Sequence, residues 1–117
     1  MDRLLRATVN SWNGLLSAAR SEAAFREELV VLAVAVPLAF LLATDLWKRL
    51  LLIGVVLLIM LVELLNTSVE KLSDVVTTVP DPAIRRIKDM GSAAVGVALV
   101  MAGLVWLAAI FERFAPW

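Results

Sequence analysis

Three long stretches without charge are the feature that most constrains what this chain of 117 residues can fold into. Residues 29–44, 50–62 and 90–111 contain no Asp, Glu, Lys or Arg, and Leu, Val, Ile and Ala dominate all three. A helix needs about 20 apolar residues to cross the roughly 30 Å hydrocarbon core of a bilayer. The alternation typical of half-buried strands does not occur in these stretches. The sequence therefore predicts an all-α membrane protein with three transmembrane helices.

Composition supports this class and excludes several others. Hydrophobic residues make up 62% of the chain, whereas ordinary soluble domains are about 45–50% apolar. The 11 basic and 11 acidic residues cancel, so there is no electrostatic basis for a nucleic-acid partner. The chain has no His and no Cys, which excludes the usual general base and any thiolate chemistry. Any chemistry that the chain performs must therefore rest on carboxylates, Lys, Arg, Asn and hydroxyl groups.

The first 20 residues have the pattern of an amphipathic helix. Apolar side chains recur at positions 5, 9, 12, 16 and 19, and polar ones at positions 3, 6, 10, 13, 17 and 20. Such a helix can lie in the membrane interface with its apolar side towards the lipid. The alternative is a helix that packs against the other spans. The sequence favours the interfacial, surface-helix interpretation of residues 1–20.

Local chemistry divides the rest of the chain. Thr44-Asp45 and Asp81-Pro82 are both typical of helix starts. Thr44-Asp45 can cap the second span, and Asp81-Pro82 offers Asp as N-cap and Pro at the first helical position of the third. We expect spans at residues 22–44, 45–76 and 81–115, all within a single membrane domain covering residues 1–117. The second span is expected to extend past the membrane on the cytoplasmic side.

The distribution of Lys and Arg predicts the orientation in the membrane. Three basic residues, Lys48, Arg49 and Arg113, fall on one side of the predicted spans. Eight fall on the other side: Arg3, Arg6, Arg20, Arg26, Lys71, Arg85, Arg86 and Lys88. Because the side richer in Lys and Arg is usually cytoplasmic, we expect the N-terminus and the 71–88 loop in the cytoplasm and the C-terminus outside.

Polar residues interrupt the second span at helical spacing. Glu63, Asn66 and Glu70 are spaced i, i+3 and i+7, which places them on one face of a helix. A carboxylate such as Glu63, directly after an uncharged run, is costly and suggests a function, for which a general base is one choice. The alternatives are a polar residue used in helix packing and a glutamate that reaches the interface.

Further polar groups are expected at the same end of the bundle. Glu22 begins the first span there, Glu27 and Glu28 follow, and Lys88, Asp89 and Ser92 begin the third. Two carboxylates on different helices can share Mg²⁺, and a lysine can meet phosphate charge. An interfacial belt of charges is the alternative, but the combined set favours metal-assisted phosphoryl transfer. Gly96 and Gly103 on the third span are expected to allow close helix packing.

Three sequence blocks carry a resemblance to a known family. EAAFREE at residues 22–28, VELLNTSVE at residues 62–70 and KDMGSAA at residues 88–94 resemble the prokaryotic diacylglycerol kinase family, and the resemblance covers nearly the whole chain. It implies a homotrimer in the bacterial inner membrane, with a surface helix and three spans per subunit. It also implies transfer of the γ-phosphate of MgATP to diacylglycerol, giving phosphatidic acid, at sites shared between neighbouring subunits.

The resemblance also implies roles for individual residues. The family's catalytic base falls on Glu63, with Asn66 beside it, and its Mg²⁺-binding glutamates fall on Glu22 and Glu70. Nucleotide binding is expected from Arg3, Asn10, Glu22, Glu70, Lys88 and Asp89. Lipid-substrate binding is expected from Arg3, Glu28, Glu63 and Ser92.

Two departures from the family pattern matter. Asn10 stands where the family often has an aromatic residue, and residues 79–82 (VPDP) differ from the nucleotide-contacting loop of well-known members. Some relatives in the wider family prefer undecaprenol, although the EAAF-R block resembles the diacylglycerol branch more closely. Two non-enzymatic interpretations stay open: a small transporter subunit that uses Glu63 as carrier carboxylate, and a structural trimer that packs through Gly96 and Gly103.

Overall fold

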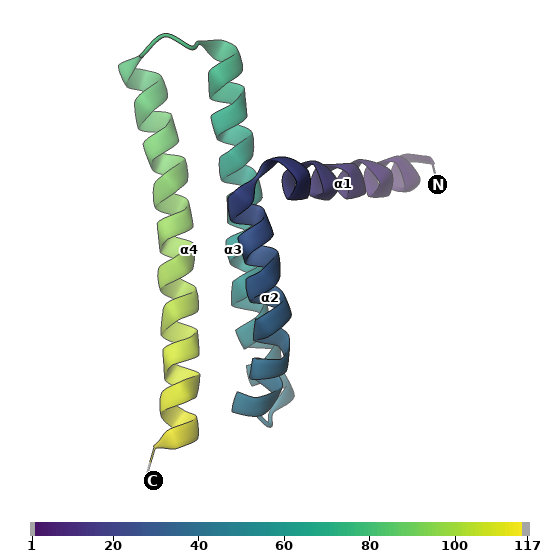
Figure 1. Ribbon diagram of the computed structural model, residues 1–117, viewed down its shortest axis with the longest axis vertical. Coiled ribbons are helices and arrows are strands. Elements are labelled where there is room, and N and C mark those ends of the chain that lie inside the picture. Colours follow the sequence, from purple (N-terminus) through teal and green to yellow (C-terminus); the bar gives the residue numbers. More distant parts are fainter. Residues whose placement is uncertain (1, 116–117) are drawn as a thin grey trace.

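The computed structural model describes residues 2–115 and consists of four helices joined by short connections (Figure 1). The helices are α1 (Asp2–Ser21), α2 (Ala23–Leu42), α3 (Leu46–Val76) and α4 (Pro82–Phe114). The predicted all-helical class is therefore confirmed.

Two helices begin at the caps that the sequence predicts. The Asp45 carboxylate accepts a hydrogen bond from the Lys48 backbone N at 3.2 Å, at the start of α3. The Asp81 carboxylate accepts from the backbone N of Ala83 at 2.8 Å and of Ile84 at 3.3 Å, and Pro82 occupies the first turn of α4. Each cap satisfies amide groups that have no partner within the helix, which fixes where the two longest helices start.

The helix α3 is the centre of the arrangement. In Figure 1, α4 runs antiparallel to α3 along its length, α2 runs beside the first part of α3, and α1 leaves the bundle sideways. Val55 and Ile59 of α3 pack against Ala98 and Ala102 of α4. On another side, Leu52 packs against α2 near its C-terminal end. The last turns of α3 extend beyond the start of α2 and are flanked by α4 (Figure 1).

The outward faces of α3 and α4 are apolar. Both helices are long and apolar enough to cross a membrane, and only 28% of the most apolar stretch of α3 and 11% of that of α4 are buried inside the chain. Large side chains such as Leu57, Leu61, Leu104 and Leu107 are exposed. A core helix of a soluble protein would bury most of this surface. These faces are therefore suited to contact with lipid or with other protein.

The helix α2 does not meet the same length and composition criteria. Arg26, Glu27 and Glu28 lie in its first third, which leaves 14 uncharged residues, 29–42, within the helix. At 1.5 Å per residue this stretch is about 21 Å long, shorter than the roughly 30 Å core of a bilayer. The predicted crossing by residues 22–44 thus depends on the charged first turns lying in the interface, and it stays a prediction.

The junction of α1 and α2, which we call the elbow (residues 21 and 22), is held by two cations. Arg26 Nη1 donates to the carbonyl oxygens of Ala19 and Arg20, both at 3.0 Å, and so caps the C-terminal end of α1. Lys71 Nζ of α3 donates to Ser21 Oγ at 3.3 Å. Ala18, next to the elbow, packs with Phe25 and with Met60 of α3. The elbow is thereby attached to one level of α3.

The close helix approach occurs at a different glycine from those expected. A Cβ atom added at Gly96 or Gly103 would have no heavy atom of residues 2–115 within 4 Å beyond its local helix backbone, whereas one added at Gly91 would overlap Asn66. Within one chain, the prediction of close packing at Gly96 and Gly103 is therefore wrong. The antiparallel register of α3 and α4 places Gly91 opposite Asn66, whose side chain fills the space that a Cβ atom at residue 91 would need.

The elbow contacts predict a specific effect of Arg26→Ala. Loss of the two hydrogen bonds should cost about 1 kcal/mol, since the guanidinium is charged but exposed, and should free α1 to change its direction. Spin labels at Thr8Cys and Ser68Cys, in molecules diluted with unlabelled protein, report the α1–α3 distance. We expect a clearly broader distance distribution in Arg26→Ala and an unchanged one in Arg20→Ala, whose side chain is also exposed. Equal widths in both variants would contradict the capping role.

Candidate active site

Three polar residues of α3 lie at the level of the elbow. Met60 and Leu64 pack with Ala18 and Phe25, and Lys71 reaches the elbow itself. Glu63, Asn66 and Glu70, which we call the polar face, lie between these two levels on the same helix. The polar face thus stands where α1 leaves the bundle, at the boundary between the uncharged part of α3 and its charged last turns.

Asn66 is the buried centre of the polar face. Its residue is only 8% exposed, and its Nδ2 donates to Glu70 Oε1 at 3.2 Å. Its Oδ1 is buried and has no hydrogen-bond partner within residues 2–115. An unpartnered buried acceptor costs about 1–3 kcal/mol. A buried acceptor of this kind calls for an explanation, such as a role in the site or a bound donor or ion, and the Asn66 Oδ1 is positioned to accept one.

Glu63 forms a pair of carboxylates with α2. It is half-buried, and Thr67 Oγ1 donates to its Oε1 at 3.5 Å. Glu28 of α2 lies close enough to experience the charge of Glu63, and Glu28 Oε1 is buried without a partner in the described part of the chain. Two neighbouring carboxylates repel when both are ionised. The structure thus brings together two of the residues expected at the lipid-substrate site, on different helices.

The oxygen ligands expected for Mg²⁺ are only partly assembled in one chain. Glu22 Oε2 lies 4.0 Å from Lys71 Nζ, and the Glu22 side chain is 25% exposed. Because Lys71 follows Glu70, the two glutamates stand at the same level on neighbouring helices. Within residues 2–115, no group of three metal-binding side chains is close enough to hold an ion. Mg²⁺ usually takes one or two carboxylates together with water and substrate phosphate, so this oxygen donor set fits it.

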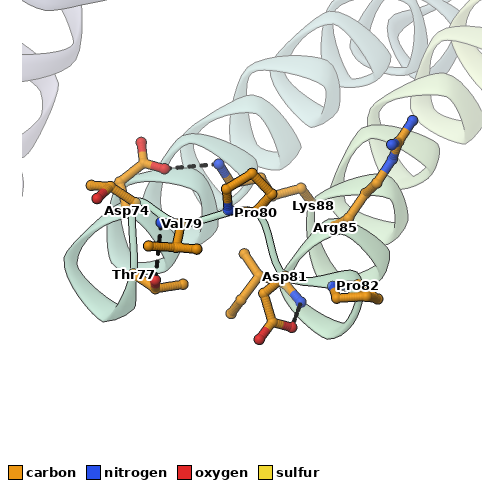
Figure 2. A pocket seen from close by; sticks show the side chains of 10 residues that line it. Asp74, Thr77, Val79, Pro80, Asp81, Pro82, Arg85 and Lys88 are labelled. Carbon is orange, nitrogen blue, oxygen red and sulfur yellow. Dashed lines mark hydrogen bonds and ion pairs between the residues drawn. The ribbon is translucent and has the colours of Figure 1, made fainter.

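Lys88 lies towards the loop between α3 and α4, away from the polar face. Its Nζ forms an ion pair with Asp74 Oδ1 at 2.8 Å (Figure 2). Asp74 is eight residues beyond Asn66, which corresponds to about 12 Å along the helix. Asp89 and Ser92 follow Lys88 on α4 and are exposed. Because Gly91 lies against Asn66, Ser92 lies at the level of the polar face, whereas Lys88 lies about one helical turn closer to the loop. Lys88 pairs with Asp74 and not with Glu63.

A hollow of about 550 Å³ opens at this loop, which we call the loop hollow. Figure 2 shows its lining by the α3–α4 connection and by the first turns of α4. Lys88 and Arg85 supply positive charge to it, and Asp74 and Asp81 supply negative charge. Asp81 is used as the helix cap, and Asp74 is paired with Lys88. The Arg85 side chain adds a cation that an anionic ligand can use.

Two expected nucleotide-binding residues lie far from the polar face of their own chain. Arg3 and Asn10 are exposed on α1, which contacts the bundle at Ala18. Arg3 precedes Ala18 by 15 residues, which corresponds to about 22 Å of helix. In Figure 1 this end of α1 points away from the other helices. A single chain therefore does not assemble the complete set of expected site residues.

Three residues with structural roles at the site escaped the residue-level analysis. Asp74 continues the spacing of the polar face at i+11 from Glu63, a signal that extending the helical periodicity would have found. Arg26 and Gly91 lie inside the EAAFREE and KDMGSAA blocks. Their positions inside these two blocks are the sequence signal that could have singled them out. Their contacts, however, depend on how separate helices pack.

Comparison with known proteins supports the same assignment. Residues 9–110 match the family described as prokaryotic diacylglycerol kinase. A protein of Escherichia coli named diacylglycerol kinase is 40% identical over 112 residues, covering 96% of this chain and 92% of the relative. Relatives of the same name from Pseudomonas aeruginosa and Helicobacter pylori are 43% and 38% identical, covering 91% and 89% of this chain and 86% and 81% of their own lengths. The chain belongs to the prokaryotic diacylglycerol kinase family.

Proposed function

We propose that this chain transfers the γ-phosphate of ATP to the hydroxyl group of diacylglycerol, giving phosphatidic acid, at the cytoplasmic surface of the membrane. The observation that carries the proposal is the polar face of α3, with a buried unpartnered Asn66 oxygen between two glutamates. The relatives named diacylglycerol kinase indicate the lipid substrate. The absence of His and Cys from the sequence agrees with a reaction that needs positioning and charge neutralisation.

The level of the polar face fits a reaction between a lipid and a water-soluble donor. If α1 lies in the interface, the elbow marks the membrane surface, and Glu63 lies at that surface beside it. The hydroxyl group of a diacylglycerol is held at the same depth by its acyl chains. The loop hollow lies further along α3 on the side away from the apolar stretch. Lipid and nucleotide would therefore approach the polar face from opposite directions.

Each residue of the polar face has a role in this proposal. Glu63 would accept the proton of the lipid hydroxyl, with Glu28 facing it from α2. Asn66 holds Glu70 through the 3.2 Å hydrogen bond, and Glu22 and Glu70 would bind Mg²⁺. When bound, the ion supplies neutralisation of the phosphate charge. Lys88 would leave Asp74 for the phosphates, and Asp89 and Ser92 would complete the contacts on α4.

The remoteness of Arg3 and Asn10 supports a site shared between copies, for which the family implies a homotrimer. An apolar groove of about 410 Å³ runs between α2, α3 and α4 and includes Val34, Ile59 and Trp106. This groove and the exposed apolar faces of α3 and α4 offer surface for neighbouring subunits. In such an assembly α1 of one copy would bring its polar residues to the polar face of another.

The proposed setting is the bacterial inner membrane, with the elbow end in the cytoplasm. The excess of Lys and Arg at that end supports this orientation, which leaves the C-terminus outside. A transporter subunit using Glu63 would need access to this carboxylate from both sides of the membrane. The position of Glu63 beside the elbow favours access from one side, and the enzymatic proposal is therefore preferred.

The first experiment identifies the substrate. Purified protein in lipid bicelles receives radiolabelled MgATP together with either diacylglycerol or undecaprenol. We expect label in phosphatidic acid, at a rate well above that with undecaprenol. Labelling of undecaprenol alone would replace the proposed substrate by the other lipid alcohol, and the absence of any labelled lipid would contradict the kinase proposal.

Replacement of Glu63 by Gln tests the proposed base. The substitution keeps the size of the side chain but removes its basicity, so kcat should fall by about 10²–10⁴-fold while the protein elutes as the same folded oligomer. Glu27→Gln is the matched control, because Glu27 is an exposed glutamate next to Glu28, and it should keep near-normal kcat. Near-normal turnover of Glu63→Gln would exclude Glu63 as the base.

Replacement of Lys88 tests the proposed phosphate contact. Lys88→Ala should raise KM for ATP by about tenfold, as expected for the loss of a hydrogen bond between charged groups. The ion pair with Asp74 is partly exposed, so the free energy of unfolding should change by less than about 1 kcal/mol. Arg86→Ala, at an exposed position on the same helix, is the control. An unchanged KM for ATP in Lys88→Ala would remove Lys88 from the nucleotide site.

A further inference from the structure

Among the glycines, Gly91 is the one where another residue within 2–115 occupies the space that a side chain would need. An added Cβ atom would overlap Asn66 Oδ1 and would lie 3.4 Å from Asn66 Cγ. At Gly14, Gly54, Gly96 and Gly103 the same atom would have nothing within 4 Å in residues 2–115 beyond the local helix backbone. The Asn66 carboxamide thus occupies space on α4 that any residue other than glycine would need.

We infer that Gly91 is a positioning residue, which seats the Asn66 carboxamide so that Asn66 holds Glu70 in place for the metal. This inference rests on the proposed function, because the metal-binding role of Glu70 belongs to it. Within residues 2–115 the carboxamide makes one hydrogen bond in this position, from Nδ2 to Glu70 Oε1 at 3.2 Å. Its Oδ1 points at the backbone of Gly91 and stays unpartnered.

The collision predicted for a side chain at position 91 is confined to the carboxamide. The third nearest atom, Val69 Cγ1, would lie 4.0 Å away, an ordinary van der Waals distance for a methyl group. Apolar packing between α3 and α4 therefore tolerates alanine. Because the colliding atom ends a side chain, Asn66 rotates away at little cost to the helix contact, but it then leaves Glu70. Gly91→Ala should therefore impair the site more than it lowers the stability of the fold.

Helix propensity favours alanine at position 91 and so opposes the destabilising effect of the collision with Asn66. Alanine is favoured over glycine in a helix interior, so the helix stability that Gly91→Ala gains offsets part of what it loses in side-chain fit. A purely structural role predicts that the melting temperature and the activity change together. A positioning role predicts that the activity and the metal affinity fall while the melting temperature changes little.

The test measures Mn²⁺ binding by electron paramagnetic resonance, with Mn²⁺ as probe for the Mg²⁺ site, on the purified protein in detergent without lipid substrate. Gly91→Ala should weaken Mn²⁺ binding and lower kcat by about tenfold each, as typical for the loss of a residue that orients a ligand. Gly96→Ala, on the same helix, should change either by less than about twofold. Gly54→Ala on α3 is a second control if residue 96 contacts another copy.

A double variant separates positioning from packing. Asn66→Ala removes the colliding atoms, so Gly91→Ala in that background should lower Mn²⁺ affinity and melting temperature no further. An independent additional loss in the Asn66→Ala background, or wild-type kcat and Mn²⁺ affinity in Gly91→Ala, would overturn the inference.

Glu70→Gln distinguishes this failure from failure of the proposed metal site. If Glu70→Gln weakens Mn²⁺ binding but Gly91→Ala does not, the inference about Gly91 fails and the metal site stands. If Glu70→Gln leaves Mn²⁺ binding unchanged, the proposed metal-binding role of Glu70 is wrong. The inference that Gly91 positions Glu70 for the metal is then wrong as well.

Discussion

The packing of α2 and α4 against α3 is the constraint on which the rest of the structure depends. In a bilayer, helices gain little from burying apolar side chains against each other, and close packing by small residues takes over that role. Ala98 and Ala102 of α4 provide such a surface for Val55 and Ile59, and Gly91 leaves room for the Asn66 side chain. The side chain that faces Gly91 is the polar Asn66 carboxamide and not an apolar side chain. The register of two helices thereby fixes the position of Asn66, the most buried residue of the polar face.

The elbow connects this register to α1. Arg26 caps the C-terminal end of α1 and Lys71 contacts the elbow from α3, so the C-terminal end of α1 and the polar face are held at one level. Beyond this level α3 continues into charged turns and the loop hollow, and before it lies the uncharged stretch of the same helix. This asymmetry along a single helix is what a reaction between a membrane lipid and a water-soluble nucleotide requires. In the proposed reaction the two reactants would come from different phases and would meet only at that boundary.

Sequence analysis predicted what one helix determines by itself. The caps Asp45 and Asp81 follow from local chemistry, and the shared face of Glu63, Asn66 and Glu70 follows from helical periodicity. The contacts of Gly91 and the neighbourhood of Glu28 and Glu63 depend on the register between helices, which spacing within one helix does not contain. For the same reason close packing was expected at Gly96 and Gly103, where small residues are spaced regularly but an added Cβ atom would meet no heavy atom of residues 2–115 within 4 Å beyond the local helix backbone.

The central claim is that the polar face lies at the membrane surface, and the depth of α3 in a bilayer tests it most directly. Because the chain has no cysteine, single cysteines can be placed at the exposed positions Leu57, Leu61, Leu65, Leu72 and Val75 and spin-labelled in lipid vesicles. Power saturation then compares collisions with oxygen, which is enriched in lipid, and with a water-soluble nickel complex. The account predicts that oxygen dominates at residues 57 and 61, that nickel dominates at residues 72 and 75, and that the change falls near residue 65. Oxygen dominance throughout, or nickel dominance already at residue 57, would contradict it.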